Sequence, residues 1–178
     1  MNTRTRNIAE LAVFTAVAFL FSYIESLFPL PIPFPGIKLG LANLVIIIIL
    51  YRNGLRAAFG VSIVRNILNA LTFGSLFGLF YSLAGSVLSL LVMAGLQIKK
   101  KGHLRLSLIS VSAVGGIIHN MGQFIVAVCL VGYSAILYYL PFLYFAGLIA
   151  GILIGILAKL CLQRLPKNIR QTSLPDRK

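Results

Sequence analysis

The sequence predicts an all-α membrane protein, a bundle of six transmembrane helices with both termini in the cytoplasm. Of the 178 residues, 59% are hydrophobic and 11% are charged, and the mean hydropathy is +0.97. This composition is typical of a helical bundle surrounded by lipid rather than water. Fourteen of the sixteen Lys and Arg residues lie at the termini or in two short breaks between apolar runs. Basic residues gather on the cytoplasmic side of membrane proteins, so this pattern orients the bundle.

Six apolar runs define the predicted helices, at residues 8–28, 39–50, 57–72, 76–97, 107–131 and 137–162. The second and third are short for a hydrocarbon layer of about 30 Å. Residues 1–7 form a predicted cytoplasmic N-terminus, 8–162 the transmembrane domain, and 163–178 a disordered cytoplasmic tail. The first run is too long for the core of a signal peptide and no small-residue cleavage site follows it, so we expect this helix to be retained.

The basic residues alternate between connections. They precede the first run, separate the second from the third and the fourth from the fifth, and follow the sixth; the interiors of 29–37, 72–76 and 131–137 carry none. An even number of spans is therefore favoured over five or seven. The net charge of +13 reflects membrane orientation rather than nucleic-acid binding, because the cations do not gather on one soluble face.

Cofactor and metal chemistry find little support in the sequence. Cys129 and Cys161 are far apart and lie in apolar runs, so we expect neither a disulfide nor a metal site. No nucleotide-binding motif of the type GxxxxGK[ST] occurs. We expect no cofactor.

Polar side chains within the apolar runs are the candidate functional residues, because polar groups in hydrocarbon are costly and usually face the bundle interior. The predicted topology places those of four helices at the same level, in the outer half of the membrane. The residues are Glu25, Lys38, Asn43, Arg65, Asn66, Asn69, His119, Asn120 and Gln123.

Helical spacing favours convergence of these side chains. Ser62, Arg65, Asn66 and Asn69 follow the i, i+3, i+4, i+7 pattern of one helix face, and His119 and Gln123 are four residues apart. Two interpretations remain open. The groups form a binding site, or they hydrogen-bond only to one another and hold the bundle together.

The charges favour an anionic ligand. Glu25 is the carboxylate near this level, and a pair with Arg65 or Lys38 would leave an excess positive charge, which grows if His119 is protonated. A phosphate, diphosphate or carboxylate group would suit this environment. The ligand-binding residues we expect are Lys38, Asn43, Arg65, Asn69, His119, Asn120 and Gln123, with Glu25 as the supporting ion-pair partner.

Residues 25–43 read ESLFPLPIPFPGIKLGLAN, with four prolines alternating with apolar residues. Proline removes backbone donors and favours an extended course. The segment is either a rigid hairpin cap or the wall of a binding site. Small residues recur every fourth position at Ala12 and Ala16, and again at Gly147, Gly151 and Gly155; such faces let helices approach closely.

The stretches KLGLAN (38–43) and GGIIHNMGQ (115–123), together with Glu25, Arg65 and Asn69, resemble the Gx transporter family, often labelled heptaprenyl diphosphate synthase component I. The resemblance covers residues 8–162. It implies a bacterial cytoplasmic-membrane protein similar to the S components of energy-coupling factor (ECF) transporters. These have six helices, bind a vitamin-like ligand from the outer side, and work with a membrane coupling (T) subunit and ATPases on other chains.

The resemblance also implies partners. Ala12 and Ala16 are similar to the small-residue motif with which the first helix of S components docks on the coupling subunit. Isoprenoid-, quinone- or flavin-related ligands are the candidates that it suggests. The alternative is a non-catalytic membrane partner of a prenyl diphosphate synthase or of a quinone- or flavin-linked redox system.

Catalysis by this chain alone is not expected. Trans-prenyl diphosphate synthases hold Mg²⁺ through two Asp-rich motifs, because ionising an allylic diphosphate requires metal neutralisation of the leaving group. The chain has a single Asp, Asp176, in its predicted tail. The sequence therefore predicts a protein that is not itself an enzyme.

Overall fold

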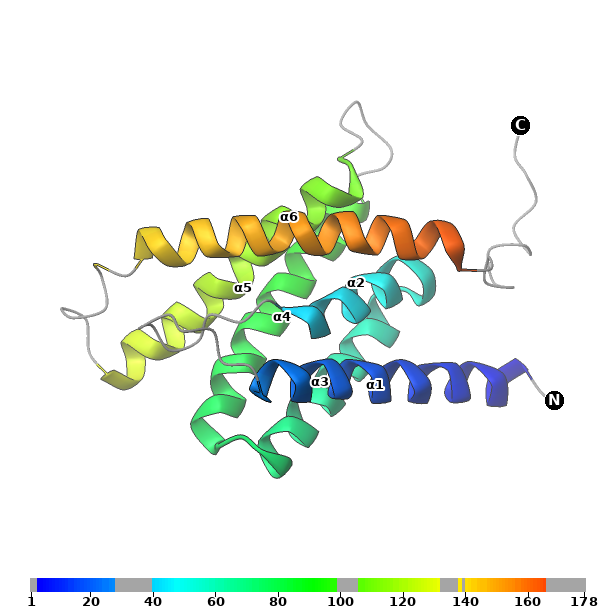
Figure 1. Cartoon of the computed structure of the whole chain (residues 1–178), viewed down its shortest axis with the longest axis horizontal. Coiled ribbons are helices and arrows are strands. Elements are labelled where there is room, and N and C mark those ends of the chain that lie inside the picture. The colour runs from blue at the N-terminus through cyan, green and yellow to red at the C-terminus, as the bar shows by residue number, and fades with distance from the viewer. Residues whose placement is uncertain (1–2, 28–39, 99–105, 132–137, 139, 166–178) are drawn as a thin grey trace.

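The computed structural model of the chain describes residues 3–27, 40–98, 106–131, 138 and 140–165 (Figure 1). The described residues form six α-helices and no strands, which confirms the all-α fold class. The helices are α1 (Thr3–Leu27), α2 (Leu41–Asn53), α3 (Leu55–Thr72), α4 (Leu76–Ile98), α5 (Leu108–Val131) and α6 (Leu140–Arg164). Helix α1 begins at Thr3, so residues 3–7 of the predicted N-terminal segment are already helical.

Four of these helices, α1, α4, α5 and α6, are long and apolar enough to cross a membrane. Helix α2 has 13 residues, fewer than the roughly 20 that cross a bilayer. Helix α3, with 18 residues, carries Arg65 and Asn66 on its buried face. The surface of the described bundle exposes many large apolar side chains, such as Leu71 at 78% and Leu76 at 73%. Such a surface suits lipid, and the protein is a membrane protein.

Helix α2 occupies the centre of the bundle. Every residue from Leu44 to Leu50 is buried, and Ile47, Ile49 and Leu50 are among the largest fully buried side chains. A helix that is apolar on all faces is stable where neighbours cover all of them. Helices α1, α3 and α6 provide that cover, as Figure 1 shows around the cyan helix.

Two glycines with positive φ bound this central helix. Gly40 precedes α2 with a φ of +76°, and Gly54 follows it with a φ of +88°. Residues other than glycine rarely adopt these backbone conformations, because their Cβ clashes with the backbone. The turn at Gly54 lets α3 fold back along α2, and the Gly54 N–H donates to the Ile49 carbonyl at 3.1 Å.

Helices α4, α5 and α6 form a tightly packed group. A Cβ on Gly151 of α6 would lie 2.6 Å from the Ser112 carbonyl of α5, and one on Gly122 of α5 would lie 2.8 Å from the Ala84 carbonyl of α4. Backbones that approach this closely leave no room for a side chain. Gly147 and Gly155 meet α5 in the same way, so the predicted glycine face of the sixth helix does pack against another helix.

Candidate ligand-binding site

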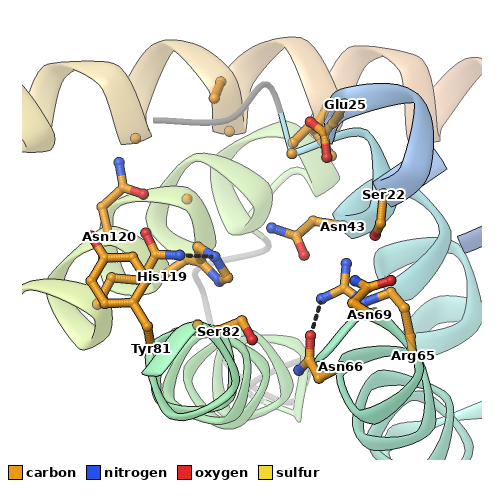
Figure 2. A pocket seen from close by; sticks show the side chains of 18 residues that line it. Ser22, Glu25, Asn43, Arg65, Asn66, Asn69, Tyr81, Ser82, His119 and Asn120 are labelled. Carbon is orange, nitrogen blue, oxygen red and sulfur yellow. Dashed lines mark hydrogen bonds between the residues drawn. The ribbon is translucent and has the colours of Figure 1, made fainter. Parts of the chain in front are cut away.

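A cavity of about 150 Å³ lies where all six helices converge (Figure 2). Its wall is polar on α1 to α5 and mostly glycine and aliphatic on α6. The polar residues are Ser22 and Glu25 from α1, Asn43 from α2, Arg65, Asn66 and Asn69 from α3, Tyr81 and Ser82 from α4, and His119, Asn120 and Gln123 from α5.

The structure brings together most of the residues singled out in the sequence. Eight of the nine line this one cavity: Glu25, Asn43, Arg65, Asn66, Asn69, His119, Asn120 and Gln123. Lys38 and most of the proline-rich segment fall outside the described residues. The one-face spacing on α3 and α5 therefore identified side chains that line one cavity, and their depth in the membrane stays a prediction.

Sequence reasoning missed part of the wall. Ser22, Tyr81 and Ser82 were not singled out, and Asn66 was left out of the candidate ligand-binding residues. A signal was present on α4, where Ser82, Ser86 and Ser89 have the spacing of one helix face. The same rule that identified the polar faces of α3 and α5 would have identified this one.

Arg65 is the central charged group of the site. Its side chain is 5% exposed, and its Nη2 donates to Asn66 Oδ1 at 2.9 Å and to Ser86 Oγ at 3.4 Å. Asn66 Nδ2 in turn donates to Ser86 Oγ at 3.2 Å, so the triad joins α3 to α4. Figure 2 shows the contact of Arg65 with Asn66 at the cavity edge. The buried Nε of Arg65 has no hydrogen-bond partner.

Glu25 accepts a hydrogen bond from the start of α2. Its Oε1 accepts the backbone N–H of Leu41 at 2.9 Å, and in the described part of the chain no ion pair joins it to Arg65. The first amides of a helix lack intrahelical acceptors and carry partial positive charge, so a carboxylate is stable there. Glu25 thus caps α2. Of the two expected pairs, the one with Arg65 is limited to attraction without an ion pair, and the one with Lys38 lies outside the described residues and stays a prediction.

The polar row of α5 makes one hydrogen bond to α6 and one within the row. Asn120 Nδ2 donates to the Leu143 carbonyl of α6 at 2.8 Å, and Gln123 Nε2 lies 3.2 Å from His119 Nε2. Gln123 is 6% exposed, and its Oε1 has no partner. Oδ1 of Asn69 on α3 is also buried without a hydrogen-bond partner. Buried polar atoms are nearly always hydrogen-bonded, so these atoms leave hydrogen-bonding capacity for a water molecule or another group in the cavity.

The small-residue face of α1 lies outside the bundle. Ala12 and Ala16 are exposed, whereas Ala18 on the opposite side is fully buried in the core. In the described residues this face therefore does not serve internal packing. Metal binding has no visible basis in the same residues, where no three His, Cys, Asp or Glu side chains gather.

Fold and cavity together define the class of protein, a helical membrane protein with a polar cavity among its helices. A family model described as heptaprenyl diphosphate synthase component I matches residues 14–161. The chain belongs to this family. No curated protein and no solved structure matches the chain.

The family description is consistent with a chain that is not the catalyst. It names a component of a synthase, and the whole sequence holds one Asp, too few for the Asp-rich motifs that bind Mg²⁺ in such enzymes. The description also implies a partner, the other component of a prenyl diphosphate synthase.

Proposed function

We propose that the protein is a six-span membrane subunit that captures a small molecule in the cavity from the outer side. In this proposal it acts like the S component of an ECF transporter, and a coupling subunit with ATPases on other chains moves the molecule across the membrane. Residues 8–162 would form the transmembrane domain, with residues 1–7 and 163–178 on the cytoplasmic side.

The observation that carries the proposal is the state of Arg65. A cation buried in a membrane protein is costly unless it is paired. In the described residues Arg65 donates hydrogen bonds to the neutral Asn66 and Ser86, Glu25 attracts it without forming an ion pair, and its Nε is unpartnered beside a cavity. An anionic or carbonyl group of a ligand would complete its interactions. Asn43, Asn69, His119, Asn120 and Gln123 would orient that group, and Lys38 remains a candidate for the same role.

The size of the cavity limits what enters it. An engineered cavity of the same volume in another protein holds a benzene-sized molecule. The bound group is therefore compact, and a prenyl chain or the remainder of a larger ligand would lie elsewhere. Isoprenoid-, quinone- and flavin-related molecules remain candidates in this sense.

A second function is favoured by the family description, which names a component of a synthase. Here the protein would recruit a prenyl diphosphate synthase, or a quinone- or flavin-linked redox protein, to the membrane without carrying a ligand. Native mass spectrometry of the detergent-purified protein separates the two functions. A co-purified small molecule supports capture, and a stoichiometric synthase bound to an empty bundle supports recruitment.

The proposed orientation has both termini in the cytoplasm. The start of α1, the α2–α3 junction and the end of α6 lie at one end of the molecule (Figure 1), and Arg4, Arg6, Arg56 and Arg164 there are exposed. We expect a cysteine at position 102, in a background without Cys129 and Cys161, to resist an impermeant thiol reagent in intact cells. A cysteine at exposed Ser75 should react. The reverse result would overturn the orientation.

Docking of another membrane subunit on α1 is part of the same proposal. Because Ala12 and Ala16 are exposed, replacing both by Leu should leave folding and ligand binding intact but block close approach of a partner helix. Co-purification with the partner measures this. Ala18→Leu, at a fully buried position, should instead destabilise the bundle. A double variant that still assembles would show that the exposed face only meets lipid.

A further inference from the structure

The cavity wall contains several hydrogen-bond acceptors that no donor of the described residues satisfies. Two of its serines have already used their protons. Ser22 Oγ donates to the Ala18 carbonyl at 3.1 Å, and Ser82 Oγ donates to the Leu79 carbonyl at 3.2 Å. A carbonyl oxygen can only accept, so the direction of both bonds is fixed. Each hydroxyl is left with oxygen lone pairs at the cavity wall.

The amide of Asn120 is oriented by the same logic. Its Nδ2 donates to the Leu143 carbonyl at 2.8 Å, so its Oδ1 is the atom left for the cavity. Gln123 Oε1 and Asn69 Oδ1 are further buried oxygens without partners. Glu25 adds a carboxylate, of which one oxygen is engaged by Leu41.

Donors are also present among the described lining residues, above all the five N–H groups of the Arg65 guanidinium. Arg65 Nε is a buried N–H without a partner. Asn43 and Tyr81 each bring a group that can donate or accept. In Figure 2 Arg65 lies on one side of the cavity, and Asn120, His119 and Tyr81 lie on the other.

We propose that the group bound in this cavity carries N–H or O–H donors next to an anionic or carbonyl acceptor, and is not a fully ionised diphosphate. This rests on the proposed capture function and narrows its ligand class. The acceptor end contacts Arg65, and the donors contact oxygens of Asn69, Asn120 and Gln123. A cyclic imide or amide and a hydroxy acid both have this pattern.

A diphosphate fits the wall poorly for two reasons. Its oxygens accept hydrogen bonds, so they would leave the oxygens of Gln123 and Asn69 unpaired, and buried unpaired polar atoms are unfavourable. Its several negative charges would also share the cavity with Glu25, and like charges in a poorly solvated site repel strongly. A group with donors avoids both costs.

Matched probes test the proposal by native mass spectrometry on the detergent-solubilised full chain. Uracil and glycolate carry donors beside acceptors. In 1,3-dimethyluracil and methoxyacetate methyl groups replace those hydrogens, and inorganic diphosphate provides acceptors alone. We expect uracil or glycolate to bind at least 10-fold more tightly than its methylated counterpart, and diphosphate not to bind.

Two variants separate hydrogen bonding from the size of the added methyl groups. Gln123→Met keeps the length of the side chain but removes its oxygen, and should reduce the preference for the unmethylated probe several-fold. Ile125→Leu, at an exposed position on the same helix, should leave the preference unchanged.

Each outcome decides the proposal. Equal binding within the pairs, or binding of none of the probes, overturns it. Binding of diphosphate through Arg65 overturns it too but leaves the capture function standing. If the capture function itself is wrong, the purified protein contains no small molecule and Arg65→Met changes the binding of no probe.

Discussion

Replacing Arg65 with Met should lower the affinity for the captured molecule by about 30-fold or more. Removing one partner of a desolvated charged contact typically costs about 2–5 kcal/mol. Arg65 lines the cavity and is only 5% exposed, so its contact with a bound group would be desolvated. The measurement is the occupancy of the co-purified molecule in native mass spectra. Arg65→Lys keeps the charge but loses the planar fork of donors. If Arg65→Lys loses as much occupancy as Arg65→Met, the planar arrangement of donors is required in addition to the charge.

The control for this experiment is a residue of the same helix that points away from the cavity. Val64 is 47% exposed, so Val64→Ala should leave occupancy unchanged. Asn66 is unsuitable as a silent control, although it is the sequence neighbour of Arg65. Its Oδ1 accepts from Arg65 at 2.9 Å, so Asn66→Ala should weaken binding indirectly. If Arg65→Met still binds the molecule at full occupancy, Arg65 has only a structural role.

A single methyl group at Gly151 should destabilise the bundle by about 1–3 kcal/mol, the usual cost of overpacking. The added Cβ would meet the Ser112 carbonyl at 2.6 Å and Ala113 Cα at 2.8 Å, and both are backbone atoms that cannot turn aside. Thermal unfolding of Gly151→Ala in detergent should show a lowered midpoint. Occupancy of the cavity should fall too, because Gly151 lines it.

The matched control is Gly60→Ala on α3. A Cβ there meets nothing within 4 Å, and alanine is more favourable than glycine inside a helix by roughly 0.5–1 kcal/mol. We expect its midpoint to be unchanged or slightly raised. Equal midpoints for the two variants would show that α5 and α6 can separate enough to admit the methyl group, contrary to the packing described above.

Several features follow from the sequence alone. The six helices lie close to the apolar runs, because lipid requires long uninterrupted stretches of apolar residues, and these are visible in one dimension. The inward faces of α3 and α5 follow from helical spacing, which is a local property. These two regularities led to Arg65, Asn69, His119 and Gln123 as members of one site, and their side chains do line one cavity.

Which side chains contact one another depends on distances across the bundle, so only the tertiary structure determines these contacts. Glu25 could have paired with Arg65 by charge, but the left-handed turn at Gly40 starts α2 where its first free amide meets the carboxylate. Ser86 orients Arg65 from a helix that sequence spacing could not place beside it. The central position of α2 is another such result. An apolar helix of 13 residues is compatible with several positions, and the packing of α1, α3 and α6 around it is a property of the whole bundle.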